Sequence, residues 1–147
     1  MDINGNNRYL FENSSYIGID LGEGRNVDVV CPGHLFKTSS KFDVVISTEC
    51  FEHDKFWQQT ILNVIENLLV PGGLFLFSCA TTGRAEHGTA RTSPADSPFT
   101  NEYYMNLTEE DIRSVIDIDK YFDKYEFKSR TTFPADLYFY GIRKTFL

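Results

Sequence analysis

The sequence of 147 residues has few cysteines, an excess of acidic over basic residues and no long apolar run. Three widely spaced thiols, Cys31, Cys50 and Cys79, do not favour a disulfide framework and fit a reducing compartment. The formal net charge of -7 disfavours sequence-independent binding of nucleic acid, because phosphate backbones are repelled. No apolar stretch approaches the ~20 residues that span a bilayer, and the polar N-terminus shows no targeting signal. These absences predict a cytoplasmic protein, away from membranes, whose partner is small or neutral.

Zinc is one alternative reading of the cysteines, because thiolates and imidazoles are its preferred ligands. Cys31 and His34 have C-x-x-H spacing, as do Cys50 and His53, and His87 adds a further imidazole. However, the chain has no C-x-x-C pair, and a free cysteine is commonly a small buried hydrophobic residue. The sequence therefore predicts no metal site.

The chain contains enough apolar residues for one domain with one core. Its hydrophobic content of 41% and charged content of 24% are ordinary for a globular protein, and two domains of half this length would each be marginal. We expect a single domain over residues 1–147, with a polar N-terminal extension at 1–15. Short runs rich in Val, Ile or Phe predict strands at residues 16–20, 26–31, 43–48 and 74–80. Their continuous apolarity is typical of parallel strands covered on both faces.

Two helices and a hairpin are expected among these strands. Apolar residues recur at three- and four-residue spacing over 54–70, which predicts an amphipathic helix that ends before Pro71 and its glycines. Thr108 is placed to cap a second helix with acidic residues in its first turn. Alternating apolar and polar residues on both sides of Pro134 predict an antiparallel hairpin. The polar stretch 81–107 is too long for a simple connection and is expected to form a loop over the strand ends.

The segment YIGIDLGEG, residues 16–24, raises the question of a phosphate-binding turn. Such a turn needs a helix that begins at its last glycine, whereas only Arg25 and Asn26 separate Gly24 from the next apolar run. The glycines therefore do not form a phosphate cradle. Asp20 ends an apolar strand, where a carboxylate can accept hydrogen bonds from both hydroxyls of a ribose. The spacing leaves open whether the next strand pairs parallel or antiparallel.

The ordered segments YIGID, VDVVCPGHLF, KFDVVISTECFEHD and LLVPGGLFLFSCA resemble class I S-adenosylmethionine-dependent methyltransferases, especially those that act on small molecules. The resemblance covers residues 16–80, and the tail hairpin fits the last two strands of that family. It implies an α/β fold, a Rossmann-like three-layer sandwich with an abbreviated, mostly parallel sheet of about six strands and an antiparallel C-terminal hairpin. It also implies S-adenosylmethionine as the cofactor, bound across the carboxyl ends of the strands, and a small-molecule methyl acceptor.

The resemblance also implies the site residues. Asp20 would hold the ribose, an adenine-contacting turn would follow the next strand, and the end of the strand at 43–48 would lie beside the methionine portion. The implied cofactor-binding residues are Asp20, Gly33, His34, Leu35, Ser47, Thr48 and Glu49. Glu52 and His53 match the family's E-H pair. A general base for a hydroxyl acceptor points to histidine, with His87 as the first catalytic candidate and His53 as the second. Tyr103, Tyr104 and Met105 either cover the pocket or dock the helix after Thr108, and docking is the favoured role for Tyr104 and Met105.

One part of the family pattern is not found. The first strand and its G-x-G-x-G turn should precede Tyr16 by about 25 residues, and only 15 are present. Because unpaired backbone groups inside a sheet cost about 1–3 kcal/mol each, the gap must close. We expect the flanking strands to pair directly, which gives a sheet of six strands. Alternatively, residues 8–11, a second copy of the chain or a partner subunit would fill the place of the missing strand. The predicted function is methyl transfer with an abbreviated cofactor site, and the alternative is an inactive accessory module that works with a partner chain.

Overall fold

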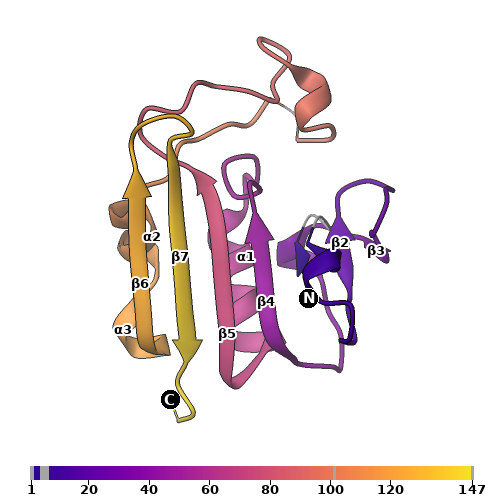
Figure 1. The fold of residues 1–147 in the computed structure, drawn as a ribbon, viewed down its shortest axis with the longest axis vertical. Helices are drawn as coiled ribbons and strands as arrows, with labels where there is room; N and C mark the ends of the chain where they lie inside the picture. The colour runs from indigo at the N-terminus through magenta and orange to yellow at the C-terminus, as the bar shows by residue number, and fades with distance from the viewer. Residues whose placement is uncertain (1, 4–6, 101, 147) are drawn as a thin grey trace.

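The computed structural model describes residues 2–3, 7–100 and 102–146, which form one sheet with helices packed against it (Figure 1). The sheet has seven strands in the order β3-β2-β1-β4-β5-β7-β6. All pairings from β3 to β5 are parallel, and β7 runs antiparallel to both of its neighbours. The strands are β1 (Asp2–Ile3), β2 (Gly18–Asp20), β3 (Val29–Val30), β4 (Phe42–Thr48), β5 (Leu69–Ala80), β6 (Phe122–Arg130) and β7 (Asp136–Arg143). The α/β class, the mostly parallel sheet and the C-terminal hairpin are confirmed.

The N-terminal residues supply an interior strand between β2 and β4. In β1, Ile3 pairs with Ile19 on one side and with Ser47 on the other, and its side chain is buried. The expectation of six strands, with β2 paired directly to β4, is therefore wrong. Residues 8–10 form a short 3₁₀ turn, η1 (Arg8–Leu10), and do not replace the strand. A strand of two residues has no alternation to detect, which explains why the sequence pattern did not reveal it.

The predicted amphipathic helix is present in two parts. The α-helix α1 (Trp57–Asn63) continues into a π-helical turn, η3 (Val64–Leu68), and the two bury an apolar stripe against the sheet. Asp54 fixes the start of α1, because its carboxylate accepts hydrogen bonds from the Phe56 backbone N–H and the Thr60 hydroxyl. The helical segment ends at Leu68, and β5 begins at the next residue.

The helices cover one face of the sheet. In Figure 1, α1, α2 (Glu109–Val115) and α3 (Ile118–Tyr121) all lie behind β4, β5, β7 and β6. Along β7, Leu137 and Phe139 are buried under this layer, whereas Tyr138 and Tyr140 on the opposite face are exposed. Within the described residues, the expected three layers are therefore reduced to two over these four strands.

Phenylalanine rings fill the space between the hairpin and the helices. Phe139 on β7 stacks on Phe77 with ring centroids 5.0 Å apart, and its centroid lies 4.7 Å from that of Phe127 and 5.4 Å from that of Phe122. Phe139 therefore joins β5, β6 and β7 in one aromatic cluster. Among the described residues, no helix is long and apolar enough to cross a membrane.

Replacing Thr108 with alanine should lower the free energy of unfolding by about 1 kcal/mol, because Thr108 caps α2. Its side chain accepts a hydrogen bond from the Asp111 backbone N–H, and the Asp111 carboxylate accepts one from the Thr108 backbone N–H. Urea denaturation measures the change. Thr108→Ser keeps the hydroxyl and should retain most of the stability, so an equal loss in both variants would contradict the capping role.

Candidate functional site

The sheet changes its direction of growth between β1 and β4. From β1 the chain adds β2 and β3 on one side, and from β4 it adds β5 and the hairpin on the other. In open α/β sheets, ligands bind outside the carboxyl ends of the strands at such a switch point. Ile3 is level with Ile19 and Ser47, so Asp20 and Thr48 lie one residue further along, on either side of the end of β1. With strands about 4.8 Å apart, the backbones at Asp20 and Thr48 are about 10 Å apart.

Asp20 and Thr48 are already engaged in hydrogen bonds at this edge. Asp20 is half-buried, and its Oδ1 accepts a hydrogen bond of 2.6 Å from the Leu21 backbone N–H. Thr48 Oγ1 accepts one of 3.1 Å from Asn7 Nδ2, which brings the segment after β1 beside the end of β4. Because a carboxylate can accept several hydrogen bonds at once, the bond from Leu21 is compatible with a ribose at Asp20.

The turn expected to contact adenine is a 3₁₀ turn, η2 (Gly33–Leu35), held against α1. Asn63 Nδ2 donates hydrogen bonds of 2.9 Å to the Gly33 carbonyl and 3.0 Å to the Phe36 carbonyl. A side chain at position 33 would place Cβ 2.6 Å from the Thr60 methyl carbon, so the close approach requires glycine. The adjacent His34 ring lies 4.3 Å from the Phe56 ring, measured between centroids. The turn is therefore a fixed part of the carboxyl edge.

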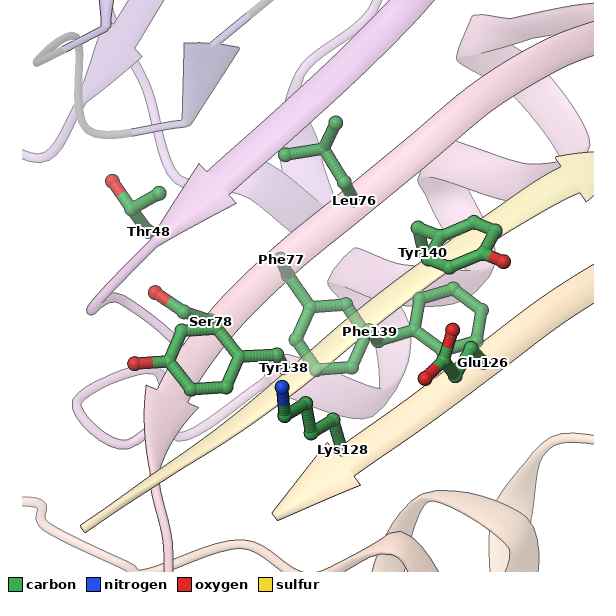
Figure 2. Close-up of a pocket in the computed structure, with 9 residues that line it drawn as sticks. All are labelled: Thr48, Leu76, Phe77, Ser78, Glu126, Lys128, Tyr138, Phe139 and Tyr140. Atoms are coloured by element: carbon green, nitrogen blue, oxygen red, sulfur yellow. The ribbon is translucent and has the colours of Figure 1, made fainter. Parts of the chain in front are cut away.

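The three residues expected beside the methionine portion diverge. Ser47 is fully buried on the helix side, whereas Thr48 lines a shallow hollow of ≈ 450 Å³ on the uncovered face (Figure 2). Glu49 has a left-handed backbone with φ 51, and its Oε1 accepts a hydrogen bond of 2.8 Å from the Ser78 hydroxyl. Its carboxylate is also 3.7 Å from Arg84. Ser47 and Thr48 both lie on β4 beside the switch point, but only the side chain of Thr48 faces away from the helices.

Residues 81–107 pass over the carboxyl ends of the strands (Figure 1). Near one end of this segment, the Leu107 N–H donates a hydrogen bond of 2.9 Å to the Ala80 carbonyl. Further along, the Phe99 ring rests on Gly22 just after β2, where an added Cβ would lie 2.3 Å from a ring carbon. The segment therefore extends from β5 to the end of β2, which carries Asp20. Phe99 covers the backbone at Gly22 there.

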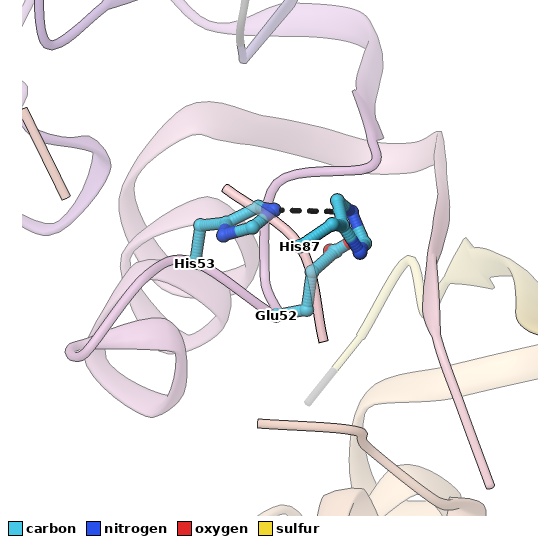
Figure 3. A group of neighbouring side chains, drawn as sticks. All are labelled: Glu52, His53 and His87. Atoms are coloured by element: carbon cyan, nitrogen blue, oxygen red, sulfur yellow. Dashed lines mark hydrogen bonds between the residues drawn. The ribbon is translucent and has the colours of Figure 1, made fainter. Parts of the chain in front are cut away.

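His87, on this segment, comes together with Glu52 and His53 from the turn after β4 (Figure 3). One potential ligand atom from each lies within 4.8 Å of the others, and the two Nε2 atoms of the histidines are 3.3 Å apart. His87 Nδ1 is 3.1 Å from the Ala85 carbonyl oxygen. A carbonyl only accepts hydrogen bonds, so in neutral His87 the proton resides on Nδ1 and Nε2 has an unshared electron pair. The two histidines that the sequence offered as catalytic candidates therefore lie side by side, next to the buried carboxyl group of Glu52.

Burial controls the charge of this cluster. Glu52 is fully buried, and burial, followed by the nearby charge of Glu49, raises the pKa of Glu52 to about 8. Burial and then the positive charge of His87 lower the pKa of His53 to about 4, so its ring is neutral near pH 7. Within the described part of the chain, neither oxygen of Glu52 makes a hydrogen bond of good geometry, and the nearby backbone N–H groups of Glu52 and Ala80 offset only part of the effect of burial. The cluster therefore presents a neutral His53 ring and a buried carboxyl group that is largely protonated near pH 7.

Tyr104 covers the two histidines. Its ring centroid is 5.4 Å from that of His53 and 5.0 Å from that of His87, and its hydroxyl donates to the Asn106 side-chain oxygen at 2.8 Å. Tyr104 therefore covers the site, whereas the sequence favoured a role in docking the following helix. Its position depends on the path of the long loop, which no local pattern encodes.

The cysteines do not join the histidines. All three thiols are free, and the group of possible metal ligands among the described residues contains Glu52 in place of any cysteine. Burial raises the pKa of the Cys50 and Cys79 thiols well above the usual value, so both remain protonated near neutral pH.

No protein-family model and no curated protein matches the sequence. Solved structures match its fold. Phosphoethanolamine N-methyltransferase 2 from Haemonchus contortus, solved with phosphomonomethylethanolamine and S-adenosylhomocysteine, has a TM-score of 0.66 at 17% identity over 97% of this chain and 48% of that one. For N-methyltransferase NodS from Bradyrhizobium japonicum WM9 with S-adenosylhomocysteine, the TM-score is 0.58 at 13% identity, over 97% and 76% of the two chains. An O-methyltransferase family protein from Burkholderia thailandensis gives 0.58 at 15% identity, over 99% and 51%. The chain thus spans about half the length of several of the structures it matches.

Proposed function

We propose that this chain, which has the fold of the class I S-adenosylmethionine-dependent methyltransferases, binds S-adenosylmethionine and transfers its methyl group to a small-molecule acceptor. One observation carries the proposal. Asp20 and Thr48 flank the switch point between β1 and β4, beside the fixed η2 turn and beneath residues 81–107. This arrangement would supply groups for a ribose, for a base and for a methionine portion along one edge of the sheet.

The expected roles follow from the chemistry of a sulfonium cofactor. Methyl transfer is an in-line displacement, so the protein contributes chiefly by aligning the acceptor with the methyl group and by excluding water. Asp20 would accept hydrogen bonds from the ribose hydroxyls, and Thr48 with Asn7 would border the methionine portion. The acidic groups near this edge, Glu49 among them, favour a cationic ligand over an anionic one.

His87 and His53 would serve the acceptor. The unshared pair on His87 Nε2 can take the proton of an acceptor hydroxyl as the oxygen–methyl bond forms. A hollow of ≈ 390 Å³ beside His87, lined also by Arg84 and Asp96, offers a place for a small polar molecule. This assignment supports a small acceptor over a macromolecular one.

Calorimetry with S-adenosylhomocysteine tests the proposal directly. We expect a saturable heat with one site per chain, and little heat from adenosine alone, because the methionine portion adds contacts near Thr48. Incubation with S-adenosylmethionine that carries a labelled methyl group, across a panel of small phenols, alcohols and amines, then identifies the acceptor. A folded sample that gives no heat with S-adenosylhomocysteine contradicts the proposal.

The second candidate is an inactive accessory module that works with a partner chain. The uncovered sheet face favours it, because Tyr138 and Tyr140 are exposed there beside the half-buried Leu76, and apolar and aromatic side chains gathered on a surface are typical of protein interfaces. A matching structure holds the Trm112 methyltransferase activator of Haloferax volcanii in complex with a putative methyltransferase. Cofactor binding that occurs only after a partner is added would favour this second function.

A further inference from the structure

Glu52, His53 and His87 meet the donor requirements of a metal centre. Imidazole nitrogens and a carboxylate oxygen together form a common ligand set for divalent transition metals. The three side chains come from two separate segments, the turn after β4 and the long loop, so the structure brings them together without any local sequence motif. Whether these ligand atoms are free to bind a cation depends on the hydrogen bonds that they already make.

The histidine pair lacks a complete set of hydrogen bonds. His87 Nδ1 faces the Ala85 carbonyl, so Nε2 of neutral His87 carries no proton and points at His53 Nε2. If His53 donates its proton there, its Nδ1 is left as a buried acceptor without a donor among the described residues, because the nearby Tyr103 carbonyl can only accept a hydrogen bond. Buried polar atoms without partners are costly, which indicates that the apo arrangement is incomplete.

The distances match those of coordination. Two Zn–N bonds of about 2.0–2.1 Å at a tetrahedral angle place the nitrogens about 3.3–3.4 Å apart. The two Nε2 atoms are 3.3 Å apart. The bond from His87 Nδ1–H to a backbone carbonyl also corresponds to the second hydrogen bond that metal-bound histidines usually make.

Glu52 provides the second, independent observation. Its side chain is completely buried and extends toward His87 in Figure 3. Neither oxygen makes a hydrogen bond of good geometry among the described residues, although the backbone N–H groups of Glu52 and Ala80 lie near enough to favour the charged form. Such a buried carboxyl group stays neutral unless a cation is bound beside it. An oxygen within 4.8 Å of both nitrogens needs a displacement of about 1.5 Å, which a change of side-chain rotamer can supply.

We propose that Glu52, His53 and His87 bind a divalent transition-metal cation of the zinc type, with one coordination position left for a small oxygen or nitrogen ligand. Three protein ligands with an open fourth position are the usual arrangement of catalytic zinc sites. Of the three ligands, His87 also lines the hollow shared with Arg84 and Asp96. A cation and an acceptor proton compete for the same lone pair on His87, so the base role of His87 applies to the metal-free protein. In the metal-bound protein, the open position would hold the acceptor atom itself, a step that rests on the proposed function.

Metal titration of the full chain tests the site. After treatment with a chelator and dialysis, the protein is titrated with Co²⁺, followed by visible absorption, and with Zn²⁺ in competition with a chromophoric chelator. We expect one ion per chain, and a rise of roughly 5 °C or more in Tm at a hundredfold excess of Zn²⁺ over Kd. Absence of saturable binding overturns the proposal.

Matched variants locate the ion. His87→Gln and Glu52→Gln should each weaken Zn²⁺ binding at least 10-fold, whereas His34→Gln, at the remaining histidine, should leave the affinity unchanged. His87 lies on the loop, so His87→Gln keeps the test valid if Glu52→Gln does not fold. Loss of binding in His34→Gln, with normal binding in His87→Gln, would place the ion at the Cys31 side and overturn the proposal. Because S-adenosylhomocysteine binding is measured on the metal-free chain, failure of the metal site is distinguishable from failure of the proposed function.

Discussion

Asp20→Asn should weaken the binding of S-adenosylhomocysteine by roughly 10- to 100-fold, because hydrogen bonds to a charged acceptor contribute about 1.5–3 kcal/mol. Asparagine has nearly the same shape as aspartate, but it offers one acceptor oxygen and no charge to the two hydroxyls of a ribose. The Asp20 Oδ1 atom already orients its carboxylate through the Leu21 N–H, so the aspartate binds with little loss of side-chain freedom. Calorimetry on the two proteins gives the ratio of affinities.

The matched control is Asp43→Asn. Asp43 is exposed near the start of β4, whereas Thr48 ends the strand. The Asp43→Asn substitution therefore removes the same charge as Asp20→Asn, but at the opposite edge of the sheet. We expect this variant to bind S-adenosylhomocysteine within about twofold of the parent chain, since exposed charges at that separation are largely screened. Equal losses in both variants would show that only the net charge matters and would remove Asp20 from the site.

Phe139→Ala should lower the free energy of unfolding by about 3–5 kcal/mol, a large part of the stability of a domain of this size. Phe139 is 4% exposed and contacts the rings of Phe77, Phe122 and Phe127, so truncation leaves a cavity at the junction of β5, β6 and β7. These neighbours belong to a paired sheet and cannot collapse freely into the space. Chemical denaturation followed by circular dichroism measures the change.

Tyr140→Ala is the control on the same strand. Tyr140 lies on the uncovered face and is 44% exposed, so its removal should cost at most about 1 kcal/mol. A similar loss in both variants would show that the uncovered face is packed in solution, for example by a second chain. That result would support the accessory-module alternative.

Patterns local in sequence predicted the fold well. The capping signal at Thr108 and the alternation in the tail correspond to α2 and to the β6–β7 hairpin. The sequence analysis missed β1. Ile3 is its one described hydrophobic residue, and only the pairing with Ile19 and Ser47 identifies that residue as part of the core. Such long-range pairing leaves no periodicity in a two-residue segment.

The candidate site was predictable only in part. Asp20 and Thr48 end their strands, and strand ends can be located from hydrophobic runs. Glu52 was noted only as half of a family pair, because a carboxylate in the chain gives no sign that its oxygens will be buried without partners. The approach of His87 to His53 depends on how residues 81–107 fold back, which is set by tertiary contacts alone.

Among the described residues, β1 is a short link between two parts of the sheet. The piece formed by β2 and β3 carries Asp20, and the piece formed by β4, β5 and the hairpin carries Thr48. Two residues of β1 join them within the sheet, and the η2 turn against α1 joins them outside it. A molecule that contacts Asp20 and Thr48 together would bridge the two parts. Its binding free energy would therefore include the cost of fixing their relative position.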